Sequence, residues 1–322
     1  MRQLLFRLAL PTFIAASITA TAAPLPAHAQ QVTTLRLGAT PDDDMTSVLW
    51  AEKSGMFRKV GIDVQMVKMH SGAAVAAAVA GGSLEGGKSS LPNIIAAHLR
   101  GIPLAIIAPA GISDSSAPYD ALLVASDSPI RSAKDLAGKT VSLPALKDLN
   151  QVVTSAWVDA HGGDSKTLHF VELPMSAAPT ALETHRVDAA VVIYPALYAA
   201  LQTGKVRALG DAYGAVAPRF LMSGWFASTD WTSKHADVVK AFNRVVVESA
   251  QYVNAHHAET APMIAEFNNL PLGVVQHMTR GIAATSLSPA LVQPMIDASL
   301  KYGIIARGFP ADELIDPIVA NH

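Results

Sequence analysis

The stretch Gly82–Ser90 (GSLEGGKSS) has the residue spacing of a phosphate-binding loop. It satisfies G-x-x-x-x-G-K-[ST], in which backbone N–H groups and the lysine contact phosphate oxygens. An ATPase also needs a Mg²⁺-binding aspartate at the end of a later apolar strand, whereas Asp188 begins its strand. The physics of the loop still applies, because Lys88, Ser89 and Ser90 offer a cation and two hydroxyls beside a predicted helix start. We therefore interpret this stretch as a candidate anion site rather than a nucleotide site.

Three consecutive aspartates, Asp42 to Asp44, offer the opposite charge after the first expected strand. At least one of them is expected to cap the helix that follows. The others could receive an ammonium, an amidine or a metal ion. We take Asp43 and Asp44 as candidate ligand contacts. A zwitterion, with its amine on the aspartates and its acid on Lys88, would use both features.

Short apolar runs alternate with helical ones along the chain, which predicts βαβ units and largely parallel sheets. In the first half we expect strands at 35–39, 62–67, 84–86 and 104–108 and helices at 45–54, 73–80 and 92–100. Lys88 to Ser90 would then open the third helix. A second α/β unit begins near Tyr119, and residues 219–227 form one more strand. Everything after Ser233 is expected to be helical, with breaks near 268–271 and 303–310.

Ligands of such sheets bind outside the carboxyl ends of the strands, at helix N-termini. Ser71 and Gly72 follow the second strand, Asn150 lies in the loop after a strand of the second unit, and Tyr194 ends another strand. Trp225, in the strand that crosses between the units, could supply an aromatic wall. The candidate ligand-binding residues are therefore Asp43, Asp44, Ser71, Gly72, Lys88, Ser89, Ser90, Asn150, Tyr194 and Trp225.

The N-terminus and the composition restrict the compartment and the chemistry. Residues 1–29 carry two arginines, an apolar run and Ala-His-Ala, the layout of a cleaved secretory signal peptide. We therefore expect a periplasmic protein that is soluble after cleavage. The chain has no cysteine, so disulfides and iron–sulfur clusters are excluded. Its formal net charge of -2 without charged blocks argues against a nucleic-acid partner. No cofactor and no metal site are expected.

Several phrases occur in an order that resembles a known family. They are 49–64 (LWAEKSGMFRKVGIDV), 82–104 (GSLEGGKSSLPNIIAAHLRGIPL), 132–141 (SAKDLAGKTV) and 187–189 (VDA). Together they resemble the ABC-transporter periplasmic solute-binding proteins of the nitrate/sulfonate/taurine type, in the thiamine-pyrimidine-synthesis-like superfamily. Ser83 departs from the pattern, since the family has an acid there.

The resemblance implies an α/β, two-lobed periplasmic-binding-protein fold (type II) with two crossover strands and a helical C-terminal tail. Lobe 1 would comprise 30–116 and 220–322, and lobe 2 would comprise 117–219. Such a protein captures a small-molecule solute, here an anionic or zwitterionic one, for a cognate ABC permease in the inner membrane. It would be a monomer and no enzyme, since the related pyrimidine synthases need cysteines and act inside the cell. There are two alternatives. The same fold could bind a neutral pyrimidine or other heterocyclic ligand, or the protein could sense a ligand and dock on a membrane receptor.

Overall fold

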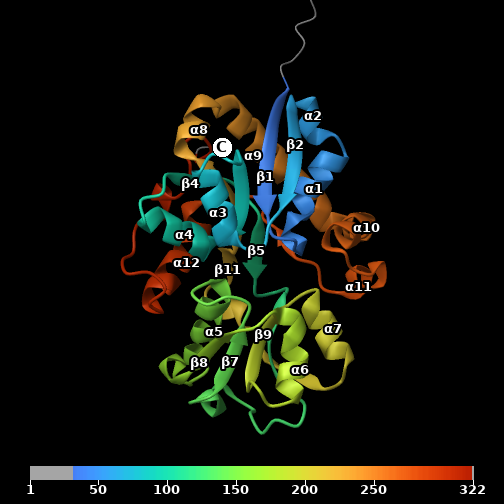
Figure 1. Ribbon diagram of the computed structural model, residues 1–322, viewed down its shortest axis with the longest axis vertical. Helices are drawn as coiled ribbons and strands as arrows, with labels where there is room; N and C mark the ends of the chain where they lie inside the picture. The colour runs from blue at the N-terminus through green and yellow to red at the C-terminus, as the bar shows by residue number, and fades with distance from the viewer. Residues whose placement is uncertain (1–31, 321–322) are drawn as a thin grey trace, which may run out of the picture. The chain divides into compact units, whose positions relative to one another are not determined.

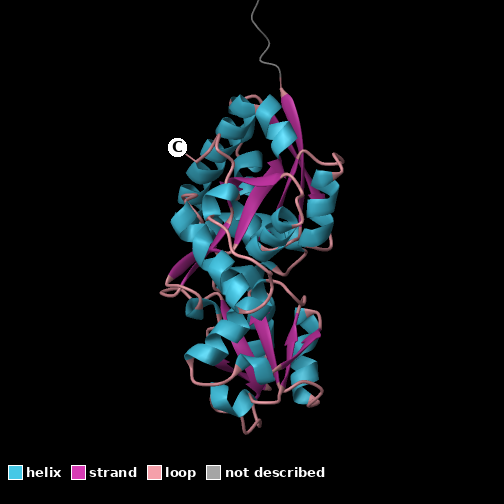
Figure 2. Cartoon of the chain, turned by 90° about the vertical axis from the view of Figure 1, so that its left-hand side faces the viewer, coloured by secondary structure: helices cyan, strands magenta, loops and turns pink. Residues whose placement is uncertain are grey.

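The computed structural model describes residues 32–320 and contains two five-stranded sheets, each flanked by helices (Figures 1 and 2). The predicted signal peptide lies outside these residues. A third sheet of three short strands joins the two parts. Across residues 32–320, none of the helices has the length and apolar character that crossing a membrane requires.

The first sheet has the strand order β2-β1-β3-β12-β4, with β1 parallel to β2 and β3, and with β12 antiparallel to β3 and β4. Its strands are β1 (Thr33–Ala39), β2 (Ile62–Lys68), β3 (Gly86–Ser90), β4 (Leu104–Pro109) and β12 (Ser223–Ser228). The helices of this part are α1 (Thr46–Lys53), α2 (Met56–Lys59), α3 (Gly72–Ala80), α4 (Leu91–Leu99), α8 (Thr229–Lys234), α9 (Ala236–Ala255), α10 (His257–Asn268), α11 (Leu272–His277) and α12 (Pro289–Lys301).

The second sheet has the order β10-β6-β9-β7-β8, in which β7 is parallel to β8 and β9 and β6 is antiparallel to β9 and β10. Its strands are β6 (Asp120–Ala125), β7 (Thr140–Leu143), β8 (His169–Glu172), β9 (Ala189–Ile193) and β10 (Val206–Gly210). The helices α5 (Leu149–Ala160), α6 (Ala178–Glu183) and α7 (Ala196–Gln202) belong to this part. In Figure 1 these elements form the lower group.

Two antiparallel strands, β5 (Gly111–Asp114) and β11 (Arg219–Leu221), carry the chain out of the first part and back. A two-residue strand, β13 (Ile282–Ala283), pairs with the other edge of β5. This is the architecture that the sequence predicted: two α/β lobes joined by two crossover strands, with helices at the C-terminal end. The exact bounds proposed for the lobes remain a proposal.

Three local predictions were wrong. The strand expected at 84–86 is β3, Gly86–Ser90, so Lys88 to Ser90 lie in a strand and the helix begins at Leu91. The strand expected over 219–227 is divided at Met222 into β11 and β12, because the first half pairs with β5 and the second with β3 and β4. The tail after Ser233 also leaves the helical state outside the two expected breaks, since it contributes β13.

The glycines of β3 explain why that strand passes through the centre of the first sheet. A Cβ on Gly87 would lie 2.2 Å from Val75 Cγ1 of α3 and 3.0 Å from the Gly38 carbonyl. Only a residue without a side chain lets β3 lie this close to α3, because the core has no room for another methyl group.

Candidate ligand-binding site

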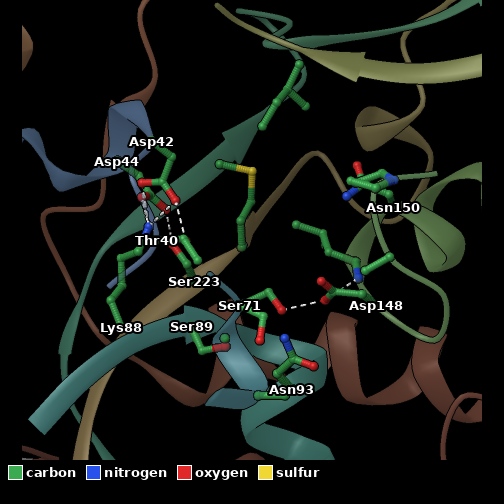
Figure 3. A pocket seen from close by; sticks show the side chains of 18 of the residues that line it. Thr40, Asp42, Asp44, Ser71, Lys88, Ser89, Asn93, Asp148, Asn150 and Ser223 are labelled. Atoms are coloured by element: carbon green, nitrogen blue, oxygen red, sulfur yellow. Dashed lines mark hydrogen bonds and ion pairs between the residues drawn. The ribbon is translucent and has the colours of Figure 1, made fainter. Parts of the chain in front are cut away.

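A cavity of about 410 Å³ lies where the carboxyl ends of strands from both sheets converge. This volume is within the range of roughly 300–1,000 Å³ found for small-molecule pockets. Its walls come from the loop after β1, the starts of α3, α4 and α5, and the segments next to β6, β9, β12 and β13. Figure 3 shows most of its polar side chains. The lining residues that matter below are Thr40, Asp42, Asp44, Ser71, Gly72, Ala73, Lys88, Ser89, Ser90, Asn93, Tyr119, Asp148, Asn150, Tyr213, Met222 and Ser223.

Lys88 forms ion pairs with two carboxylates of the loop after β1. Its side chain is 2% exposed, and its Nζ lies 2.5 Å from both carboxylate oxygens of Asp42. It also donates to Asp44, which accepts a further hydrogen bond from the Ser223 hydroxyl. The Asp42 carboxylate accepts from the Thr40 hydroxyl at 3.2 Å. The lysine is therefore not a free cation.

The two carboxyl groups differ in their proton affinity. Burial, and then the neighbouring Asp44 charge, raises the pKa of Asp42 well above its ordinary value, although Lys88 opposes the shift. Burial would raise the pKa of Asp44 too. The Lys88 ammonium and hydrogen bonds from Asp42, Lys88 and Ser223 outweigh it, so the pKa falls to about 2. Asp44 is thus the carboxylate that carries the negative charge opposite Lys88.

The start of α3 presents unpaired hydrogen-bond donors to the cavity. The first N–H groups of a helix have no acceptor within the helix. Ser71 satisfies one of them, because its hydroxyl accepts from Ala74 N at 3.2 Å. Those of Gly72 and Ala73 remain beside the cavity. These two N–H groups and the positive end of the helix dipole favour an acidic group at this point.

The Ser89 hydroxyl lies against the same wall. Its oxygen is buried and, within residues 32–320, has no hydrogen-bond partner. A Cβ placed on Gly72 would lie 1.9 Å from that oxygen and 2.8 Å from Asn93 Nδ2, so only glycine leaves the hydroxyl its position. Since buried polar groups are normally hydrogen-bonded, Ser89 indicates a missing partner in the cavity.

The opposite wall begins with Asp148, the N-cap of α5. Its Oδ1 accepts from Leu149 N at 2.7 Å and from the Ser90 hydroxyl at 2.5 Å, which links the second lobe to the first. Burial raises the pKa of Asp148 above its ordinary value, and the hydrogen bonds from Ser90 and Leu149 partly oppose that. Asn150 is the second residue of α5, and its Oδ1 accepts a hydrogen bond from the Tyr213 hydroxyl at 2.9 Å.

Seven of the ten residues predicted from sequence line this cavity: Asp44, Ser71, Gly72, Lys88, Ser89, Ser90 and Asn150. They come from four strand ends, as expected for a doubly wound fold. Lys88 nevertheless has a different environment from the one expected. The sequence predicted an accessible ammonium, whereas the structure surrounds it with carboxylates.

The other three predicted residues do not line the cavity. Asp43 is 1% exposed and forms a buried ion pair with Arg280 at 2.7 Å, so it fastens the C-terminal segment to the loop after β1. Trp225 is fully buried, with its ring at 6.0 Å and near right angles to that of Phe242. The Tyr194 carbonyl accepts a hydrogen bond from the Tyr119 hydroxyl, and Tyr119 lines the cavity whereas Tyr194 does not.

Sequence reasoning missed Asp42, Asn93, Tyr119, Asp148, Tyr213 and Ser223 as lining residues. Asp148 could have been found, because an aspartate just before a helical run and just after a strand is an N-cap candidate at the correct sheet edge. Asn93 lies inside the first turn of α4, after Leu91 and Pro92, and only its place near a helix start could have indicated it. Tyr213 and Ser223 carry no local signal, since Tyr213 reaches the cavity by packing beside α5 and Ser223 by following the return strand β11.

With this geometry established, comparison with known proteins identifies the family. The family model described as NMT1/THI5 like matches residues 42–260. The chain belongs to this family. The predicted family, solute-binding proteins of the nitrate/sulfonate/taurine type, is therefore confirmed.

Similar proteins of known role support the same grouping. A taurine-binding periplasmic protein of Escherichia coli is 26% identical over 272 residues, which is 82% of each chain. A formylaminopyrimidine-binding protein of Halalkalibacterium halodurans is 25% identical over 154 residues, 48% of this chain and 45% of that one. The crystal structure of the periplasmic aliphatic sulphonate binding protein from Escherichia coli superposes with a TM-score of 0.72 at 18% identity, covering 90% of this chain and 94% of that one. The last comparison shows a shared fold.

Proposed function

We propose that this family member is the solute-binding component of an ABC importer. It captures one small organic solute between its two lobes and delivers it to a permease in the inner membrane. The observation that carries the proposal is the cavity itself, which strand ends and helix starts of both lobes enclose. Contacts from both lobes to one solute stabilise the closed form, as in hinge-closing binding proteins. The similar periplasmic binding proteins support the role.

The acidic end of the solute is proposed to bind at the start of α3. Three kinds of group lie together there: the N–H groups of Gly72 and Ala73, the Ser71 residue that caps the helix, and the Ser89 hydroxyl, which has no partner within residues 32–320. This part of the proposal keeps the anionic or zwitterionic solute predicted from sequence, but it moves the anion from Lys88 to the helix. A carboxylate or sulfonate fits such a set of donors.

A neutral heterocycle is the second candidate, favoured by the formylaminopyrimidine-binding relative. The cavity offers it amide groups from Asn93 and Asn150 and aromatic surface from Tyr119 and Tyr213. Under either candidate the protein acts as an exported periplasmic monomer, without cofactor, catalysis or nucleic acid. A ligand-sensing role on a membrane receptor would use the same cavity.

A thermal-shift screen of the mature chain, residues 30–322, tests the proposal. The panel contains sulfonates, carboxylates, amino acids, aminosulfonates, amines and pyrimidines. A solute at one hundred times its Kd stabilises the fold by about 2.7 kcal/mol, which raises the Tm of a chain of this size by about 4 °C. We expect a rise in Tm of this size only with compounds of one chemical class in the panel. If no compound raises the Tm, the solute-binding role is wrong.

Uptake measurements separate import from sensing. Deleting the gene from its host should abolish accumulation of the radiolabelled hit, and restoring it should recover uptake. Normal uptake in the deletion strain would reject the importer role while leaving binding intact.

A further inference from the structure

The charges that line the cavity are predominantly negative. The acidic side chains among the lining residues are Asp42, Asp44 and Asp148, and the basic ones are the buried Lys88 and the solvent-exposed His70. None of the arginines in residues 32–320 contributes to the lining. Even when Asp42 holds a proton, the carboxylates of Asp44 and Asp148 outnumber the single lysine. A purely anionic solute would therefore enter a cavity of its own charge, which is unfavourable in a buried site.

Lys88 cannot relieve this repulsion, because its donors already point at acceptors. Its Nζ contacts both oxygens of Asp42 and one oxygen of Asp44, and an ammonium has three N–H donors. The lysine is also 2% exposed, so a solute reaches it only by displacing those carboxylates. The positive charge of Lys88 is therefore paired with carboxylates of the protein itself.

Asp148, in contrast, has an oxygen to spare. Its Oδ1 caps α5 and accepts from Ser90, but its Oδ2 has no hydrogen-bond partner within residues 32–320. Asp148 lies on the wall facing Ser89 and the start of α3 (Figure 3). A cation beside it would offset the cost of burying its charge. On the facing wall, the buried Ser89 hydroxyl marks the position of a second polar contact.

We propose that the solute is a zwitterion, or a larger molecule with the same two ends, whose protonated amine or amidine is bound by Asp148. Its acidic end lies at the start of α3, so this inference rests on the proposed solute-binding function and deepens it. Asp148 then selects against simple sulfonates and carboxylates. The Ser90–Asp148 hydrogen bond holds the carboxylate in place from the other lobe, so the cation site is complete only when the lobes are together.

Calorimetric titration of the mature chain at pH 7.5 with matched compounds tests this inference. One series is 3-aminopropanesulfonate, propanesulfonate and propylammonium. A second, which fills more of the cavity, is 4-(aminomethyl)benzenesulfonate, toluenesulfonate and benzylammonium. The amine-bearing sulfonate of the tighter series should bind at least about tenfold more tightly than the sulfonate that lacks the amine, since a charge-assisted hydrogen bond is worth roughly that factor or more.

Two matched substitutions locate the effect. Asp148→Asn keeps the helix cap and the oxygen that accepts from Ser90 but removes the charge. It should weaken binding of the amine-bearing compound by about ten- to a hundredfold. The affinity for the sulfonate without an amine should stay the same or increase. Asp164→Asn is the control, because Asp164 also caps a helical turn, accepting from Lys166 N at 3.0 Å, but does not line the cavity.

The outcomes separate the two proposals. Sulfonates without an amine that bind as tightly as their amine-bearing partners, or an amine preference that survives Asp148→Asn, would overturn the inference and leave the binding function standing. Binding confined to neutral pyrimidines would do the same. If neither these series nor the wider panel binds, the inference and the proposed function both fail.

Discussion

Replacing Lys88 by methionine should destabilise the protein strongly. Methionine keeps much of the volume and removes the ammonium, leaving Asp42 and Asp44 buried against each other without a cation. Removing one partner of a buried ion pair costs about 3–5 kcal/mol. The structure puts Lys88 in that regime, because its side chain is 2% exposed and those of Asp42 and Asp44 are 27% and 15% exposed. Native domains have only about 5–15 kcal/mol of total stability.

The assay is thermal unfolding without added solute at pH 7.5. For a chain of this size, a loss of 3–5 kcal/mol corresponds to a Tm lower by about 5–8 °C. The control is Lys139→Met, which removes an exposed pair with Asp188 at 3.5 Å. Exposed pairs contribute about 0–1 kcal/mol, so this variant should melt within about 2 °C of the wild type.

Adding Asp44→Asn to Lys88→Met tests the cause. The double variant removes the unpaired buried charge along with its partner, and it should regain part of the lost stability. A Lys88→Met protein that melts within about 2 °C of the wild type would refute the reasoning. It would mean that Lys88 is not held by the carboxylates and is available to an anionic solute.

Three further predictions follow from the same contacts. Gly72→Ala should weaken solute binding about tenfold in titration calorimetry, because a Cβ at this position would lie 1.9 Å from the Ser89 hydroxyl and 2.8 Å from Asn93 Nδ2 and displace both. Because the pKa of Asp44 is lowered to about 2, its ionisation stabilises the fold above its ordinary pKa of 3.8, and that contribution disappears as the pH falls toward 2. In urea unfolding, the stability difference between wild type and Asp44→Asn should therefore shrink between pH 4 and about pH 2; a constant difference would contradict this assignment. Arg280→Met should cost about 3–5 kcal/mol in urea unfolding by leaving Asp43 buried and unpaired, and a loss below about 1 kcal/mol would show that the pair is dispensable.

Local patterns were sufficient to predict the fold and the edge of the sheets where the site lies. Apolar runs such as the fully buried β4 alternate with helical runs, and this alternation predicts parallel strands joined by helices. Since helix starts follow strand ends, Ser71, Gly72 and Asn150 could be placed at the cavity without any structure. Their positions depend on secondary structure alone.

The pairing of charges could not be predicted in the same way. Lys88 meets Asp42 and Asp44 because β3 lies beside β1, a contact across more than forty residues. From the sequence, a lysine before two serines indicates a helix start with a free cation. In the structure β3 continues to Ser90, and the ammonium contacts the carboxylates of the loop after β1. The charge preference of the cavity was therefore the least predictable feature.

Aromatic residues were equally hard to place. Trp225 lies inside β12 and Tyr194 directly follows β9, and in a strand a shift of one residue decides which face a side chain takes. Packing assigns Trp225 to the core against Phe242, while Tyr119 and Tyr213, which carry no local signal, reach the cavity.

The most direct test of the account is a crystal structure of the mature chain with the compound that raises its Tm most. The account predicts that compound within the cavity between the two lobes, with an acidic or polar atom within hydrogen-bond distance of Ser89 Oγ and a nitrogen within hydrogen-bond distance of Asp148 Oδ2. A compound bound elsewhere on the protein, with the cavity unoccupied, would contradict the account.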